Sequence, residues 1–380
     1  MAIGFILIPA LIASGIAAYS RFGTGLFGKG SSKKKGVIGG PAAPTTLLLM
    51  TTRTPDHSRP ADTLTLFSVG GGQQPFVLLI PSQTLTEIPG YGFDVVGNAM
   101  SFGRVPLASI AVSNMLGIRI DHTVVIDDSA VAAAVDKIGP ITVDVPSNLF
   151  AAQGGELVPV FSAGSQQMNG KQAVRYLTYQ GPNETELSRL AREQQIFDAV
   201  FAKAGSGLAQ VIGSMPVEGD TGAGELGRLL AAVSAAPQSA RTYDVVPVQP
   251  VGAGGDEGAF KVTSADLDVE VGKFLSASRT GVTPGTHPRL QLLNGNGRPE
   301  AGVSVAQRLI PAGFRIVDSG NARSFDFAKT KIIVYANDDA SMAVAQQVRK
   351  LLGVGEIEVA ARSQTSVDVT VVIGKDVRTA

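Results

Sequence analysis

The feature that most constrains the fold is a regular alternation of strand-like and helix-like segments after residue 46. Short runs rich in Leu, Val, Ile and Phe, such as 47–50 and 63–69, are separated by polar and glycine-rich stretches, which favours strands. Longer segments such as 105–117 and 186–204 repeat apolar residues every three to four positions, which favours helices. Hydrophobic strands that alternate with helices are typical of α/β proteins. We therefore expect a mixed central sheet with helices on both faces.

A second set of these segments follows 278–288, a stretch rich in Gly, Pro and Thr that is typical of a linker. From 289 to 376 the chain twice repeats strand, helix and strand, and it ends on one more strand. Two β-α-β passes of similar length predict a small α+β domain. The predicted domain limits are therefore 47–277 for the α/β domain and 289–376 for the small domain.

The amino-terminal segment predicts a membrane anchor. Residues 3–19 are apolar and uncharged, and about 17 apolar residues is the lower limit for a helix that spans a bilayer. We expect an anchor over 1–22 and a flexible basic linker over 23–46. Six basic residues and no acidic residue precede Asp56. Because these charges follow the apolar run, the positive-inside rule places the body in the cytoplasm.

Composition excludes several classes of protein. The absence of cysteine excludes a disulfide scaffold, a thiolate metal site and a cysteine nucleophile. The three histidines are too scattered in the sequence to suggest a metal cluster. The 32 basic and 32 acidic residues give a net charge of zero, and no helix-turn-helix pattern occurs, so nucleic acid is not an expected partner.

Several motifs, taken in their order and spacing, resemble a known family of cell-envelope proteins. They are RPADT at 59–63, IPSQTLTEIPGYG at 80–92, LGIRIDHTVVID at 116–127, VDKIGPITVDVP at 135–146, MNGKQAVRY at 168–176 and RLAREQQ at 189–195. With them, 47–200 resembles the LytR-CpsA-Psr family. The pieces LLNGNG, TKIIVYA and DVTVVIG make 289–376 similar to the LytR C-terminal domain.

The resemblance implies a single-pass protein of the cell membrane whose body is extracytoplasmic, which the charges beside the anchor contradict. Enzymes of this family transfer a glycopolymer from a polyprenyl pyrophosphate carrier to peptidoglycan. The resemblance further implies an apolar lipid pocket, a Mg²⁺ ion and arginines that hold the pyrophosphate, and an aspartate that helps to activate the acceptor hydroxyl. Guanidinium groups and a divalent cation stabilise the charge that spreads over phosphate oxygens in such transfers.

The resemblance assigns roles to individual positions. It predicts Asp62 and Arg59 as catalytic residues, Asp62 as the metal ligand, and Arg53, Arg175, Arg189, Arg192 and Gln194 as pyrophosphate ligands. Other positions depart from the family pattern, and these are Thr51, Ser82, Gln83, Thr178, Gln180 and Glu193. Removal of one positioned charge donor typically costs about 3 kcal/mol, or roughly a hundredfold in rate. The loss of several predicts weak or absent turnover.

Three functions are therefore open. The leading hypothesis is an envelope-biogenesis protein that binds a lipid-linked glycopolymer through a degenerate, weak or inactive transferase site. An alternative is an active phosphotransferase that uses Mg²⁺ and a re-routed arginine clamp to attach glycopolymers to peptidoglycan. A third is an envelope-assembly protein that binds a protein partner through 289–376.

Overall fold

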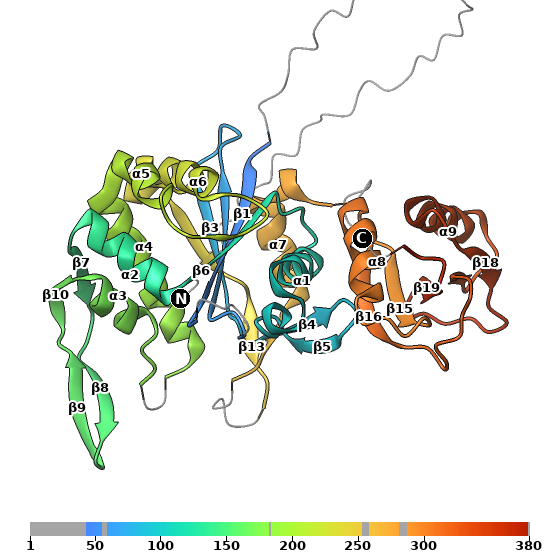
Figure 1. Ribbon diagram of the computed structural model, residues 1–380, viewed down its shortest axis with the longest axis horizontal. Helices are drawn as coiled ribbons and strands as arrows, with labels where there is room; N and C mark the ends of the chain where they lie inside the picture. Colours follow the sequence, from blue (N-terminus) through green and yellow to red (C-terminus); the bar gives the residue numbers. More distant parts are fainter. Residues whose placement is uncertain (1–42, 55–58, 182–183, 253–257, 281–286, 379–380) are drawn as a thin grey trace, which may run out of the picture. The chain divides into compact units, whose positions relative to one another are not determined.

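A computed structural model describes residues 43–54, 59–181, 184–252, 258–280 and 287–378 (Figure 1). The predicted anchor at 1–22 and almost all of the predicted basic linker lie outside these ranges. Among the described helices, none combines the length and the apolar character that a membrane span requires.

The central sheet has six strands in the order β11-β6-β1-β2-β3-β12. Its strands are β1 (Thr45–Thr52), β2 (Thr63–Val69), β3 (Phe76–Ile80), β6 (His122–Asp127), β11 (Glu218–Gly219) and β12 (Thr242–Val245). Strand β1 runs antiparallel to β2 and parallel to β6. The glycines at 70–72 lie in the hairpin turn that connects β2 to β3. The expected mixed sheet is confirmed.

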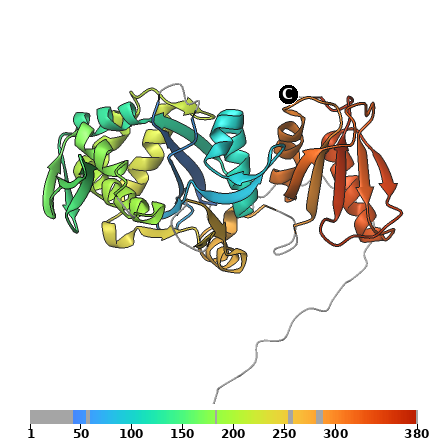
Figure 2. The same ribbon diagram turned by 90° about the horizontal axis from the view of Figure 1, so that it is seen from below.

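Helices cover both faces of this sheet (Figures 1 and 2). Leu47 and Leu49 of β1 belong to one core, against α2 (Asp128–Ile138), α4 (Glu186–Ala204), α5 (Leu208–Ile212) and α6 (Ala223–Ala235). Leu48 and Met50 belong to the opposite core, against α1 (Asn98–Leu116) and α7 (Ser264–Phe274). Because alternate residues of a strand point to opposite faces, a strand buried on both faces is apolar throughout.

Three smaller sheets complete the α/β domain. The four-stranded sheet has the order β13-β14-β4-β5, from β13 (Val248–Pro250), β14 (Phe260–Val262), β4 (Thr84–Ile88) and β5 (Gly92–Val95). Strands β7 (Ile141–Val145) and β10 (Gly164–Met168) pair beside α3 (Gly170–Leu177), while β8 (Leu149–Gln153) and β9 (Glu156–Phe161) form a hairpin. Short 3₁₀ turns are η1 (Gly205–Gly207), η2 (Gln238–Ala240), η3 (Ser276–Ser278) and η4 (Ile310–Ala312).

The carboxy-terminal domain has a five-stranded sheet in the order β16-β15-β19-β17-β18. Its elements are β15 (Arg289–Asn294), α8 (Ala301–Leu309), β16 (Arg315–Asn321), β17 (Lys331–Val334), α9 (Asp339–Leu352), β18 (Glu356–Val359) and β19 (Val369–Ile373). The two predicted β-α-β passes are present, since β15 is parallel to β16 and β17 is parallel to β18. Buried Asn114 of α1 exchanges hydrogen bonds of 2.8 and 2.9 Å with the backbone of Ile316 in β16. The predicted domain limits stay predictions.

The motif at 168–176 has a structural explanation. Asn169 caps α3, because its side chain accepts a hydrogen bond from the backbone N–H of Gln172 and the Gln172 side chain accepts one from Asn169. Gly170 lies against α2, and a Cβ atom on it would lie 2.1 Å from the carbonyl oxygen of Ala132. Only glycine allows α2 and α3 to approach this closely.

We predict that Gly170→Ala lowers the free energy of unfolding by about 2–3 kcal/mol, because the backbone of α2 has to move to admit the methyl group. Denaturant unfolding followed by circular dichroism measures this change. The matched control is Gly207→Ala, since no atom lies within 4 Å of the Cβ that this change would add. Its expected effect is smaller than about 1 kcal/mol. Equal effects of the two substitutions would contradict the close contact at Gly170.

Candidate functional site

A cleft of about 450 Å³ opens at the end of β1, next to the start of α4. We call it the polar cleft. It is lined by Arg53, Asp62, Ser82, Gln83, Gln180, Gly181, Glu184, Thr185, Glu186, Arg189, Pro250, Val251, Gly258, Ala259 and Phe260. The cleft thus brings together three of the residues predicted for the site, Arg53, Asp62 and Arg189. It also contains the substituted positions Ser82, Gln83 and Gln180.

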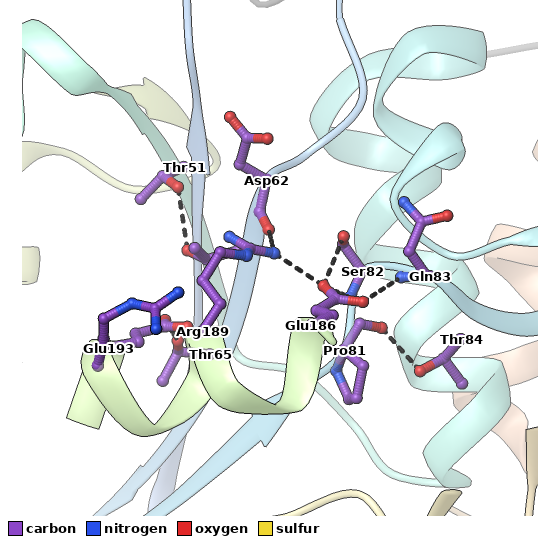
Figure 3. Close-up of polar contacts among 12 residues, drawn as sticks. Thr51, Asp62, Thr65, Pro81, Ser82, Gln83, Thr84, Glu186, Arg189 and Glu193 are labelled. Atoms are coloured by element: carbon purple, nitrogen blue, oxygen red, sulfur yellow. Dashed lines mark hydrogen bonds and ion pairs between the residues drawn. The ribbon is translucent and has the colours of Figure 1, made fainter. Parts of the chain in front are cut away.

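Glu186, in the first turn of α4, holds this helix against the loop between β3 and β4 (Figure 3). Its Oε1 accepts hydrogen bonds from the N–H of Ser82 at 2.6 Å and from the Ser82 hydroxyl at 2.7 Å. Its Oε2 accepts one from the N–H of Gln83 at 3.0 Å, and Arg189 donates to Oε1 at 2.8 Å. Ser82 and Gln83 therefore hold a carboxylate of this chain.

Both arginines of the polar cleft are paired. The Nε of Arg53 donates to the two carboxylate oxygens of Asp62 at 3.2 and 3.0 Å. Arg189 donates to the backbone oxygen of Asp62 at 2.6 Å as well as to Glu186 (Figure 3). With Glu184, the lining contains two arginines and three carboxylates. Its formal charge is therefore negative, although a pyrophosphate site needs excess positive charge.

Arg192 makes contacts within the chain, and its predicted ligand role stays a prediction. Its side chain is buried, and Nη1 donates to Glu184 at 2.9 Å while Nη2 donates to Glu184 at 3.1 Å and to the backbone oxygen of Tyr179. The guanidinium also lies 5.0 Å from the centre of the Tyr179 ring. Arg192 thus ties Tyr179 and Glu184 to α4.

The other predicted positions lie elsewhere. Arg59 is exposed, Gln194 is half-buried, and exposed Arg175 lies over the ring of Phe161 at 5.8 Å. Thr178 ends α3, where its hydroxyl donates to the Val174 oxygen at 2.8 Å. None of these four is among the described residues that line the polar cleft. Their predicted roles stay predictions that the cleft geometry does not support.

Asp128 is a residue that the sequence reasoning missed. Burial raises its pKa to about 6, and the negative charge of Asp62 adds to the shift while Arg53 opposes it. Its buried Oδ1 has no hydrogen-bond partner among the described residues. Strands β1 and β6 are parallel, with Thr52 opposite Asp127, so their carboxyl ends meet at one edge. The sequence signal for this residue was the Asp127-Asp128 pair, which directly follows the β-branched run at 123–126.

A second, mostly apolar cavity of about 80 Å³ lies between the sheet and the helices around α4. We call it the apolar cavity. Its polar lining residues are Thr51, Thr63 and Glu193, and its apolar ones are Leu49, Ile126, Val131, Ala134, Val135, Leu177, Ile196, Phe197, Val200, Phe201, Leu208, Ile212, Met215 and Leu230. Thr51, one of the positions predicted to depart from the family pattern, shares a 3.0 Å hydrogen bond with Thr63.

We predict that Arg192→Ala lowers the free energy of unfolding by about 3 kcal/mol, because it leaves Glu184 and a backbone carbonyl without their buried partner. Thermal and urea unfolding measure the loss. Arg175→Ala is the matched control, because it removes an exposed guanidinium from another helix and costs less than about 1 kcal/mol. A stable Arg192→Ala protein that loses only ligand affinity would show that Arg192 is a ligand after all.

Comparison with known proteins identifies similar chains. Probable cell wall biosynthesis protein LcpB of Corynebacterium glutamicum is 26% identical over 145 residues, which are 38% of this chain and 34% of that protein. The polyisoprenyl-teichoic acid–peptidoglycan teichoic acid transferase TagU of Halalkalibacterium halodurans is 31% identical over 153 residues, 39% of this chain and 48% of that protein. The matched regions thus span about a third to a half of the length of these relatives.

Solved structures share the fold. The crystal structure of Bacillus subtilis TagV has a TM-score of 0.52 at 20% identity, and it covers 62% of this chain and 97% of its own. TagT of the same organism, with bound octaprenyl pyrophosphate lipid, has a TM-score of 0.50 at 18% identity and covers 64% and 94%.

Two family models match consecutive parts of the sequence. The LytR_cpsA_psr family matches residues 32–214, and the model described as LytR cell envelope-related transcriptional attenuator matches 288–376. The first match covers the α/β domain from β1 to α5, and the second covers the five-stranded carboxy-terminal domain. The chain therefore contains a LytR-CpsA-Psr domain followed by a LytR C-terminal domain.

Proposed function

We propose that this protein binds a polyprenyl-pyrophosphate-linked glycopolymer at the membrane in cell-envelope biogenesis, and that its transfer step to peptidoglycan is weak or lost. The observation that carries this proposal is the polar cleft itself, whose arginines Arg53 and Arg189 are each paired with a carboxylate of the chain. In a phosphoryl transfer these groups stabilise the charge on phosphate oxygens. Arginines that are already neutralised by Asp62 and Glu186 stabilise it less.

The two neighbouring hollows support an amphiphilic ligand. Along α4, Glu186 and Arg189 line the polar cleft, and Ile196 and Phe197 line the apolar cavity. An anionic head group fits the polar cleft, and a hydrocarbon tail fits the neighbouring apolar cavity. TagT, which has the same fold, was solved with bound octaprenyl pyrophosphate lipid, and also bound to LI-WTA and to LIIa-WTA. These relatives support the same chemical class of ligand here.

The apolar cavity needs to open for such a tail. Its 80 Å³ is smaller than the cavity of about 150 Å³ that takes one benzene molecule. A polyprenyl chain therefore enters only if the helices that line the cavity separate. Short helix α5, with five residues, contributes Leu208 and Ile212 to the wall.

A magnesium ion fits the acidic side of the cleft. Mg²⁺ is usually held by one or two carboxylates together with substrate phosphates. Asp62 and Asp128 would hold it, because the unpartnered Oδ1 of Asp128 and the mutual repulsion of these carboxyl groups are relieved by a cation. When bound, the ion supplies positive charge for the phosphate oxygens, which the paired arginines lack. The described residues contain no group of three or more acidic or histidine side chains suited to a metal. Substrate phosphates would supply the remaining ligands.

The test uses the full chain in detergent, with a polyprenyl pyrophosphate-linked glycan as ligand and peptidoglycan as acceptor. We expect saturable binding that Mg²⁺ strengthens, and transfer at least a hundredfold slower than with B. subtilis TagT as positive control. Binding is measured by thermophoresis and transfer by phosphate incorporated into peptidoglycan. Magnesium-dependent transfer at a rate similar to that of TagT would establish the alternative, an active phosphotransferase.

Substitutions locate the binding site. We predict that Arg189→Ala raises the dissociation constant for the lipid-linked glycan at least tenfold, since a charged hydrogen bond contributes about 1.5–3 kcal/mol. Arg175→Ala is the control, and it leaves binding unchanged because Arg175 does not line the cleft. If Arg175→Ala weakened binding and Arg189→Ala did not, the head group would lie beside α3, which would contradict the proposed site.

A further inference from the structure

Glu193 lies at the boundary between the polar cleft and the apolar cavity. Residues of three elements, α4, β1 and β2, line first the polar cleft and then the apolar cavity. On α4 the order is Arg189, Glu193, Ile196, and on β1 it is Arg53, Thr51, Leu49, in each case from the cleft to the cavity. On β2, Thr63 lines the cavity and the preceding Asp62 lines the cleft. A ligand that occupies both hollows therefore passes Glu193.

The carboxyl group of Glu193 is buried and only half satisfied. The side chain is 2% exposed, and the Thr65 hydroxyl donates to Oε1 (Figure 3). Oε2 has no hydrogen-bond partner among the described residues, although Glu193 lines the cavity. A buried polar atom without a partner costs free energy that a ligand can recover.

The surroundings favour the neutral acid. Burial raises the pKa of Glu193 to about 7. The hydrogen bond from Thr65, the positive charge of Arg189 and the nearby Thr63 hydroxyl oppose this shift, and the negative charge of Glu186 adds to it. The remaining elements around the cavity present apolar side chains to it, among them Ile126 of β6 and Val131 of α2. Arg189 and Glu186 are thus the charged groups that face Glu193.

We propose that Glu193 is a specificity residue that, as a neutral acid, donates a hydrogen bond from Oε2 to the phosphate oxygen nearest the hydrocarbon of a single-chain lipid phosphate. As a carboxylate the same group repels that oxygen and places a charge at the entrance of the apolar cavity. Lipid binding is therefore regulated by protonation of Glu193. This inference rests on the proposed function, because it places the lipid head group in the polar cleft.

The experiment compares wild type with Glu193→Gln, in the full chain in detergent, with decaprenyl phosphate as probe and decaprenol as neutral control. Affinity is measured between pH 5.5 and 8.5. In wild type we expect the dissociation constant to rise at least tenfold more over this range than in Glu193→Gln, whose amide keeps an N–H donor at every pH. Titration of the lipid phosphate itself, with a pKa near 6, is common to both proteins. Decaprenol shows no comparable difference between them.

Two further variants make the comparison specific. Glu87 is another buried carboxyl group whose pKa burial raises to about 7, and it does not line either hollow. Glu87→Gln should keep the pH profile of wild-type binding. Thr65→Val removes the hydroxyl that stabilises the Glu193 carboxylate, so it should move the midpoint of the binding profile to higher pH.

Stability measurements show whether the variants fold, and they also report the protonation of Glu193. Between about pH 4.5 and 7 the folded state holds a proton on Glu193 that the unfolded state has lost, so stability falls as the pH rises through this window. The urea midpoint of wild type should therefore fall more steeply between pH 5 and 8 than that of Glu193→Gln.

The outcomes separate the two proposals. If decaprenyl phosphate binds wild type and Glu193→Gln with the same pH profile, the role of Glu193 is wrong and the proposed function stands. If no variant binds decaprenyl phosphate at any pH while the glycan-linked lipid also fails to bind, the proposed function is wrong and this inference falls with it.

Discussion

The docking of α4 onto the central sheet is the interaction on which the site depends. Glu186 receives four hydrogen bonds, from the backbone and side chain of Ser82, from the backbone of Gln83 and from Arg189. These bonds fix the first turn of α4 above the ends of β2 and β3. The later turns then cover the sheet with Leu190 and Phe201. Because one rigid helix lines both the polar cleft and the apolar cavity, the two hollows are held in a fixed order.

Charge balance decides what this site can do. A guanidinium that is paired with a carboxylate of its own chain contributes less to an added phosphate than a free one. Arg53 with Asp62, Arg189 with Glu186, and Arg192 with Glu184 are all such pairs. The family fold has been kept, and the described charges of the cleft largely satisfy one another. A fold shared with transferases therefore does not establish transfer here.

Most of the fold was predictable because it follows from local patterns. The periodicity of 186–204 predicted α4, and the two β-α-β passes after 289 were recognised from alternating apolar runs. Strands β8 and β9 were missed, because they form a largely exposed hairpin without a buried face. The short strands β12 and β13 are separated at Pro247, which lacks an N–H for the sheet.

The sequence by itself indicated the family and the fold class, because motifs and periodicity are properties of consecutive residues. The positions that depart from the family pattern stay predictions from the sequence. Only the tertiary structure decided which charges meet. It brought Asp128 beside Asp62, turned Arg192 to Glu184 and buried Glu193 in an apolar wall. Some of these contacts join residues on different strands and helices. Others depend on which side of α4 a residue occupies. Their electrostatic energies depend on distance and burial, which the order of residues does not specify.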